Sequence, residues 1–176
     1  MSALHALLND PGAVGTWQLV PARSSVRFKN KTFWGLATVT GKFGDVSGAG
    51  QIGANAAVSG RLDIRASSLK TGIGKRDEHL RSADFFDVEN HPDIHVEVSA
   101  LEPTGSDTAS LTGTITVRGV RQPLPLSATV TPLGDGTVQV SAQAVVDRTT
   151  FGVSGNMIGM MPVTTTLLAD IVFAKA

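Results

Sequence analysis

The sequence predicts an all-β protein: a single antiparallel β-barrel of about eight strands, with a short helical excursion near residues 67–93 and a short N-terminal helix. Apolar and polar residues alternate with a period of two over most of the chain, which is typical of strands with one buried face. Parallel strands buried on both faces have continuously apolar sequences, so these strands are antiparallel. A sheet of this size hides its edges completely only by closing into a barrel.

The chain begins with a segment that suits one or two helical turns over residues 3–8. Asp10, Pro11 and Gly12 end this segment. The strand-like alternation begins at Trp17. We therefore predict an N-terminal extension at residues 1–16 and one barrel domain at residues 17–176, as the length of 176 residues also suggests.

Eight alternating segments follow, separated at several joints by residues that favour turns, such as Gly134, Asp135 and Gly136. Pro123 and Pro125 fall in one segment, which places it at a bulge or an open seam because proline cannot donate to a strand ladder. The segments lie at residues 25–29, 36–43, 58–65, 94–99, 111–118, 124–130, 138–144 and 167–173.

One segment, from Ser67 to Asp93, interrupts the alternation. Its composition suits a short helix or two helical turns that end before His91 and Pro92. Long connections in compact domains are usually functional or act as lids.

The residues that should face the barrel interior are unusually small. Small side chains do not fill the interior of an eight-stranded barrel. Either the barrel is flattened or something apolar occupies the space. These positions are Gly60, Gly113, Ala128, Ala142, Ala144 and Ala169.

Composition excludes several classes of function. The chain holds 15 Lys or Arg and 15 Asp or Glu, so it lacks the basic surplus of a general nucleic-acid binder. It has no cysteine, which excludes disulfides, cysteine-ligated metals and thiol nucleophiles. No apolar run approaches the ~20 residues that span a bilayer, so we expect no stable membrane insertion. The N-terminus lacks the basic region and apolar length of a signal peptide, which predicts a cytoplasmic protein unless a leader has been removed.

Five ordered motifs resemble those of the YceI-like family. The most specific is T-G-(x3)-R-D-x-H-L-x-S-x-D-F-F-D, from Thr71 to Asp87, followed by His91 and Pro92. The others lie at residues 17–28, 39–43, 111–120 and 147–152. The resemblance covers about nine-tenths of the chain and leaves residues 1–16 outside it.

The resemblance implies a lipocalin-like barrel, extended and often dimeric. Family members bind amphiphiles with long apolar chains, such as polyisoprenoid diphosphates, isoprenoid quinones or fatty acid amides. It therefore implies binding, storage or transport of such a lipid in an apolar tunnel. We expect no enzymatic activity, no cofactor and no metal. Many members are periplasmic, and this chain departs from them because its sequence shows no signal peptide. A homodimer is compatible with the pattern.

The expected tunnel lining gathers the aromatic residues and the methionine segment, because methionine adapts to variable apolar partners. An alternative is that these residues form ordinary core or a dimer face. The lining residues are Phe28, Phe33, Trp34, Leu36, Val39, Phe43, Leu80, Phe85, Phe86, Phe151, Met157, Ile158, Met160 and Met161.

Four residues are candidates for contact with a lipid head group: Arg76, Asp77, His79 and Arg148. Arginine suits this role because a guanidinium binds phosphate through two parallel hydrogen bonds. The alternative is that Arg76 and Asp77 pin the excursion to the barrel rim.

The spacing of the histidines disfavours a zinc site, which usually shows closer pairs. Two other functions stay open. One is an enzyme acting on such a lipid through His79, Asp77 and Arg148, and the other is a stress-related interaction module with a filled barrel.

Overall fold

The structure is a computed structural model that describes residues 2–32, 37–153 and 164–176. Two α-helices and twelve strand segments make up most of the described chain, with single 3₁₀ turns between some of them. Among the described residues, no helix is long and apolar enough to cross a bilayer. The helices are α1 (Ala3–Leu8) and α2 (Gly74–Arg81), and the strands are β1 (Gly15–Leu19), β2 (Ser25–Thr32), β3 (Ala37–Phe43), β4 (Val46–Ile52), β5 (Val58–Arg65), β6 (Leu69–Lys70), β7 (Asp93–Pro103), β8 (Thr108–Val117), β9 (Val120–Pro123), β10 (Leu126–Pro132), β11 (Val138–Asp147) and β12 (Thr164–Lys175).

Eight strands form a closed antiparallel ring in the order β1-β4-β5-β7-β8-β10-β11-β12. The pairing of β1 with β12 closes the ring, with Trp17 opposite Lys175 and Leu19 opposite Phe173. The predicted all-β barrel of about eight strands is therefore confirmed.

The remaining strands lengthen the barrel wall at one end. The long strand β12 pairs with β1 near its C-terminus and with β2 over Thr166 to Asp170. Both β1 and β2 therefore pair with β12, one after the other along its length, and the 3₁₀ turn at Pro21–Arg23 separates them. Strand β3 pairs with β2, just as β4 pairs with β1. The short strand β6, which follows β5 in the chain, pairs with β3.

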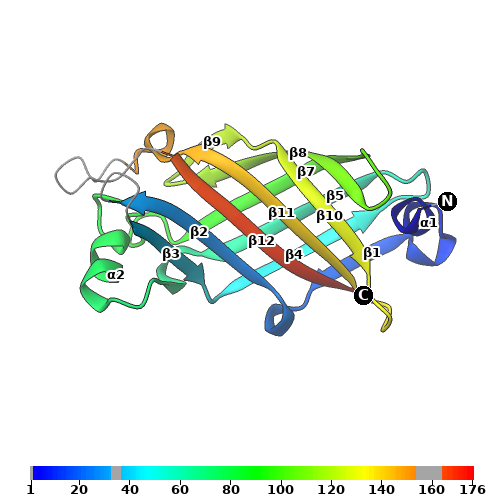
Figure 1. The fold of residues 1–176 in the computed structure, drawn as a ribbon, viewed down its shortest axis with the longest axis horizontal. Coiled ribbons are helices and arrows are strands. Elements are labelled where there is room, and N and C mark those ends of the chain that lie inside the picture. Colours follow the sequence, from blue (N-terminus) through cyan, green and yellow to red (C-terminus); the bar gives the residue numbers. More distant parts are fainter. Residues whose placement is uncertain (1, 33–36, 154–163) are drawn as a thin grey trace.

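The barrel is elongated, with α1 at one end and α2 at the other (Figure 1). Strand β12 has 12 residues, so it is about 40 Å long at ~3.3 Å per residue. Barrel strands tilt by ~35–45°, which gives a wall roughly 30 Å long along the axis.

The eight alternating segments did not include the ring strands β1 and β4, and two of them form β2 and β3, which lie outside the ring. The sequence pattern is weakest in β4. Its residues, VSGAGQI, include two glycines and few large apolar side chains. A Cβ atom at Gly48 would lie 2.4 Å from the carbonyl oxygen of Arg61 on β5. Glycine lets the two backbones approach closely, and this weakens the alternating pattern that identifies a strand.

The predicted strand with two prolines divides at them. Pro123 ends β9, which pairs with β8 outside the ring, and Leu126 begins β10. Between them, the Leu124 N–H donates to the Gly113 carbonyl at 2.8 Å. The prolines therefore lie at the break between β9 and β10, two strands that pair with different parts of β8.

The predicted N-terminal helix is confirmed as α1. Ser2 caps it by accepting a hydrogen bond from the His5 N–H at 3.2 Å. Leu4 is fully buried and Leu8 nearly so, and both pack in one core cluster with Trp17, Val130 and other residues at this end. Helix α1 therefore closes one end of the barrel, and the proposed division between residues 16 and 17 stays a prediction.

The excursion over residues 67–93 contains the short helix that its composition predicted, α2, together with a series of turns and the two-residue strand β6, which was not predicted. Leu80 and Phe85 of this segment belong to the larger core cluster, together with Phe28, Phe43 and Phe151. The excursion therefore packs onto the opposite end of the barrel from α1.

Candidate functional site: an apolar tunnel

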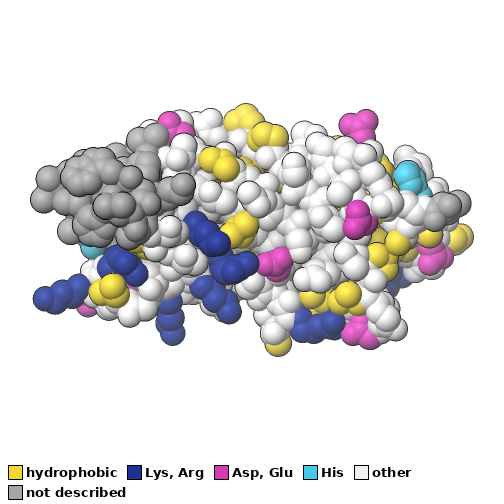
Figure 2. Space-filling model, viewed as in Figure 1, with side chains coloured by type: hydrophobic (Ala, Val, Ile, Leu, Met, Phe, Trp, Pro, Cys, Tyr) yellow, Lys and Arg dark blue, Asp and Glu magenta, His cyan; other side chains and the backbone are white. Residues whose placement is uncertain are grey.

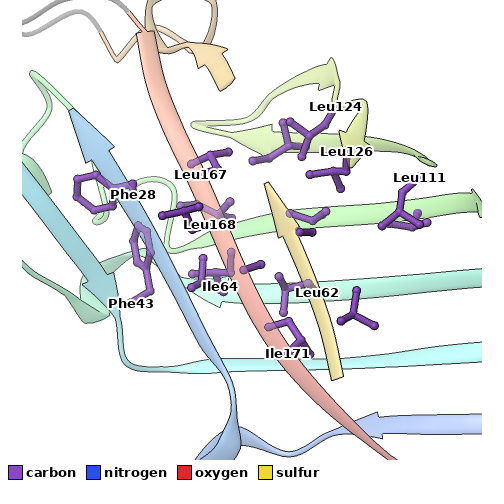
Figure 3. A pocket seen from close by; sticks show the side chains of 18 of the residues that line it. Phe28, Phe43, Leu62, Ile64, Leu111, Leu124, Leu126, Leu167, Leu168 and Ile171 are labelled. Carbon is purple, nitrogen blue, oxygen red and sulfur yellow. The ribbon is translucent and has the colours of Figure 1, made fainter. Parts of the chain in front are cut away.

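A cavity of about 720 Å³ lies inside the barrel. Every strand of the ring contributes to its wall, as do β2, β3 and both helices. Most of the lining side chains are apolar. Figure 3 shows Leu62, Ile64, Leu111, Leu167 and Ile171 arranged around this space.

Three of the six small residues predicted to face the interior line the cavity: Gly60, Ala142 and Ala169. Ala142 and Ala169 lie directly opposite one another on β11 and β12. Their short side chains leave the space that larger residues would fill. The barrel is therefore hollow here, which argues against an interior packed with side chains.

The other three small residues serve the packing of the wall. A Cβ atom at Gly113 would lie 2.7 Å from the carbonyl oxygen of Glu97, so the strands approach closely there. Ala128 and Ala144 are buried and do not line the cavity.

At the α1 end, leucines form the cavity wall. Leu4, Leu7 and Leu8 line it together with Trp17 of β1. The Trp17 indole N–H donates to the Ala13 carbonyl at 2.9 Å, which satisfies its one polar group in an apolar setting. The α1 leucines and Trp17 therefore offer a long apolar chain hydrophobic contacts, and the polar residues Gln51 and Ser59 also line the cavity near this end.

Three phenylalanines gather at the α2 end. The ring centroids of Phe28, Phe43 and Phe86 lie 5.5–6.0 Å apart in tilted and edge-to-face arrangements. Phe28 and Phe43 come from β2 and β3 and lie near one another in Figure 3. The Phe28 ring also covers Gly41, where a Cβ atom would lie 2.2 Å from it.

Basic residues line the cavity at the same end: Lys75, Arg76 and His79 of α2, and Arg148 of the turn at Arg148–Phe151. Arg148 is 5% exposed, and its Nη1 donates to the Val153 carbonyl at 2.6 Å. Burial lowers the pKa of Arg148, although the nearby Asp147 carboxylate acts in the opposite direction. An arginine stays charged at neutral pH, so the cavity holds a buried cation at this end.

Arg76 and Asp77 both contact Thr71. The Arg76 guanidinium donates to the Thr71 hydroxyl at 2.8 Å and to its carbonyl at 3.0 Å. The buried Asp77 carboxylate accepts hydrogen bonds from the Thr71 N–H at 2.9 Å and from the Thr71 hydroxyl. Thr71 belongs to the excursion itself, so these contacts hold α2 to the segment before it, and the pinning of the excursion to the barrel rim stays a prediction. Arg76 also lines the cavity.

His79 interacts with other members of the excursion. Its Nε2 lies 3.2 Å from the Asp84 carboxylate, and its ring meets Phe85 edge-on at 4.9 Å. His95, by contrast, pairs with Asp63 of β5 at 2.6 Å. Among the described residues, no group of three metal-ligating side chains is arranged to hold a metal ion.

Seven of the predicted lining residues contribute to the cavity wall, and their contact with a ligand stays a prediction. They are Phe28, Val39, Phe43, Leu80, Phe85, Phe86 and Phe151. Seven others lie outside the described residues: Phe33, Trp34, Leu36, Met157, Ile158, Met160 and Met161.

The sequence analysis did not select two features of the site. The leucines of α1 were not included in the lining, although their spacing over positions 4, 7 and 8 marks one apolar helix face. Arg118 was also missed. Its Nη1 lies within 2.6–3.0 Å of the carbonyls of Ala83, Phe85 and Gly152, so it ties the excursion to the turn that carries Arg148. No sequence signal identifies those backbone partners.

The family model described as the YceI-like domain matches residues 17–173. A UPF0312 protein of Pseudomonas putida is 32% identical over 99 residues, which are 53% of this chain and 52% of that protein. A UPF0312 protein of Pseudomonas syringae pv. tomato is 31% identical over 117 residues, which are 64% of this chain and 59% of that protein. The chain thus spans about half the length of the curated relatives it matches.

Solved structures share the fold over most of this chain. BcnA of Burkholderia cenocepacia superposes with a TM-score of 0.80 at 21% identity, covering 88% of this chain and 98% of that one. A polyisoprenoid binding domain from Saccharophagus degradans, implicated in plant cell wall breakdown, has a TM-score of 0.74 at 17% identity over 91% of this chain and 98% of that one. The YCEI protein of Campylobacter jejuni has a TM-score of 0.64 at 24% identity, with 80% and 86% covered. At such identities the likeness establishes the fold.

Proposed function

This chain belongs to the YceI-like domain family, and from that premise we propose that its barrel binds a long-chain amphiphilic lipid. The observation that carries the proposal is the apolar cavity of about 720 Å³, which has lining residues near both ends of the barrel. Its volume lies within the ~300–1,000 Å³ of small-molecule sites. The barrel is roughly 30 Å long, so its interior suits an extended chain better than a compact molecule. The solved relative described as a polyisoprenoid binding domain supports the same class of ligand.

Hydrophobic transfer supplies enough free energy for such binding. Each buried methylene contributes roughly 0.8 kcal/mol, so ten of them give about 8 kcal/mol before the cost of ordering the chain. Without that cost, a free energy of that size corresponds to a Kd of about 1 µM, and the ordering cost weakens the affinity from this limit. A longer chain buries more methylene groups against that cost, so no polar anchor is strictly required.

We place the lipid head group at the α2 end. That end carries Arg148, Arg76 and Lys75, whereas leucines of α1 line the other end. Arg61 also reaches the cavity edge, but its guanidinium is paired with Asp63 at 2.9 Å. An anionic head group would gain from the cations of the α2 end, because charge-assisted hydrogen bonds are stronger than neutral ones.

Binding rather than catalysis is the role that the geometry favours. Of the residues in the alternative enzymatic hypothesis, Asp77 is occupied by Thr71 and does not line the cavity. Storage or transport of the lipid, a cytoplasmic location and a homodimer remain predictions from the sequence.

Native mass spectrometry and organic extraction of the purified protein test the proposal. We expect a co-purifying lipid, or binding of a polyprenyl phosphate, an isoprenoid quinone or a fatty acid amide with a Kd below about 100 µM. A ligand pair with the same chain and either an anionic or a neutral head group tests the head-group placement. The proposal is wrong if nothing apolar co-purifies and none of the three ligand classes binds.

A variant that fills the tunnel sharpens this test. Ala169→Phe adds a ring to a wall position that faces the cavity, so it should weaken binding of a long ligand at least tenfold while the protein still folds. Ala100→Phe is the matched control, because Ala100 is an exposed position of β7. Equal affinities of the two variants would show that the ligand does not occupy the cavity.

A further inference from the structure

The outer face of β2, β3 and β6 is strongly basic. In register, Arg27 lies opposite Lys42, and Lys42 lies opposite Lys70, so three cations form a row across three neighbouring strands. Lys29 lies two positions along β2 from Arg27, on the same face. The sequences of these three strands contain no Asp or Glu. Figure 2 shows Lys and Arg side chains gathered over this part of the molecule.

The row lowers the stability of the isolated protein, because like charges directly opposite one another destabilise a sheet. One counter-charge is present, since Arg27 pairs with Asp170 of β12 at 3.2 Å. Within the described residues, no ion pair involves Lys29, Lys42 or Lys70, all of which are exposed. The whole chain has zero net charge, so the positive charge of this face is balanced by acidic residues elsewhere in the molecule.

An exposed apolar residue adjoins the basic row. Ile73 is 54% exposed and precedes α2, in the loop between Lys70 and Lys75. Both Ile73 and Lys75 also line the cavity. The loop therefore presents an apolar side chain between two lysines at the α2 end of the tunnel.

We propose that this basic face, with Ile73 at its edge, docks the protein onto an anionic lipid bilayer, with the α2 end of the tunnel toward the membrane. Lysines near an anionic leaflet are attracted to its surface, and an apolar side chain gains by entering the boundary between head groups and acyl chains. A nucleic acid offers its backbone charge to the lysines but no apolar layer to Ile73. The inference rests on the proposed function, because a protein that binds a lipid in its tunnel exchanges that lipid with a bilayer.

Glu78 of α2 and Asp84, which lie near the same end, partly oppose this attraction. The docking is therefore expected to be reversible and to weaken with ionic strength, because salt screens exposed charges beyond ~8–10 Å.

Vesicle co-sedimentation tests the docking surface. The wild-type protein should bind phosphatidylcholine vesicles that contain phosphatidylglycerol and should bind pure phosphatidylcholine vesicles far more weakly. Each cation near an anionic surface contributes roughly a fivefold factor in affinity. The triple variant Lys29→Glu, Lys42→Glu and Lys70→Glu should therefore bind at least about a hundredfold more weakly.

The matched control carries the same change of net charge on other surfaces: Arg23→Glu, Arg121→Glu and Lys175→Glu. It should keep most of the wild-type binding. Equal losses in the two triple variants would mean that overall charge, and not this face, governs binding. Unchanged vesicle binding in the first variant, or a stronger preference for duplex DNA than for vesicles, would also overturn the proposal.

The absence of cysteine allows a direct test of Ile73. An environment-sensitive fluorophore on Ile73→Cys should shift to the blue when anionic vesicles are added. The same fluorophore on Val14→Cys, an exposed apolar position at the α1 end, should not shift. Equal responses, or none at Ile73, would contradict the proposed orientation.

Lipid content separates failure of this inference from failure of the proposed function. Native mass spectrometry reports the cargo of each variant without any membrane. A protein that carries a lipid but ignores anionic vesicles would refute only the docking surface. A protein that docks but carries and binds no lipid would refute the function and leave the surface standing.

Discussion

At the scale of single residues, the tunnel depends on a close contact between Phe28 and Gly41. The two residues are direct cross-strand partners on β2 and β3, and the aromatic ring lies over the glycine. The absence of a side chain at Gly41 lets the ring pack flat at the wall, in contact with Phe43 and Phe86. Glycine at this position thereby shapes the cavity near its charged end.

Gly41→Ala should therefore lower the free energy of unfolding by about 1–3 kcal/mol, because the new Cβ atom forces the Phe28 ring to move. Guanidinium titration measures the loss. Gly74→Ala is the control, since no atom lies within 4 Å of a Cβ atom there and alanine is the better helix former. If both variants match the wild-type protein, Phe28 does not need the space above Gly41.

Arg118 joins three backbone carbonyls that belong to two distant segments. Its φ of +53° lies in the left-handed region, which asparagine also tolerates. Arg118→Asn removes the guanidinium with little added backbone strain. We expect it to lower the unfolding free energy by roughly 1–3 kcal/mol, because three carbonyls, one of them on the buried Phe85, lose a charged donor.

Chemical denaturation of Arg118→Asn should be compared with that of Arg121→Asn. Arg121 is exposed, and its contact with Glu97 is long, at 3.5 Å, so its loss should change stability by less than about 0.5 kcal/mol. If Arg121→Asn lost more unfolding free energy than Arg118→Asn, Arg118 would not be holding the excursion in place.

At the scale of elements, α1 and the excursion close opposite ends of the barrel with different chemistry. Helix α1 presents leucines to the interior, whereas the excursion presents phenylalanines together with cations. The excursion is held by a dense set of internal contacts. Among them, the Arg81 guanidinium donates to the carbonyls of Ser67 at 3.1 Å and Leu69 at 2.7 Å. Helix α1 has only six residues, so its position depends on the burial of its leucines.

Leu4→Ala should therefore loosen α1 and speed the exchange of a bound lipid. Leu4 is fully buried, and such truncations typically cost 2–5 kcal/mol. Transfer of a fluorescent long-chain lipid to vesicles, followed in a stopped-flow instrument, measures the exchange rate. Leu7→Ala is the control, because Leu7 is only half-buried and should have a smaller effect. Identical exchange rates in all three proteins would mean that α1 does not restrict the tunnel.

At the scale of the whole molecule, exposed carboxylates couple stability to pH. Hydrogen bonds from the side chain and backbone of Thr137, followed by one from Arg23, lower the pKa of Asp135 to about 2. Hydrogen bonds from Thr149 lower the pKa of Asp147 in the same way. For Asp63, burial acts to raise the pKa, but hydrogen bonds from His95 and Arg61 outweigh it.

A carboxylate with a lowered pKa in the folded state stabilises that state above its unfolded pKa of 3.8 and loses the contribution as pH falls. We therefore predict that Tm declines between about pH 4 and pH 2. Thermal melts across this range, compared between the wild-type protein and Asp135→Asn, measure the effect. The variant should show a shallower decline, and a wild-type Tm that does not change over this range would contradict the prediction.

The sequence by itself determined the class of fold and the position of its unusual segment. Alternation along β5, β8, β11 and β12 is a local property, because successive side chains of a strand point to opposite faces. It therefore predicted a ring of about eight strands before any pairing was known. The composition of residues 67–93 likewise located α2, and the apolar residues before Pro11 located α1.

Only the tertiary structure decided which residues meet. Glycine-rich β4 became visible as a ring strand through its pairing with β1 and β5. The opposition of Ala142 and Ala169, the reach of Arg118, and the row of Arg27, Lys42 and Lys70 all depend on register between distant strands. Register is set by the packing of the whole barrel, since a shift of one residue turns every side chain of a strand to the other face. The alternation within one strand does not specify its register with a distant strand, so the tunnel and the basic face could be identified only from the closed barrel.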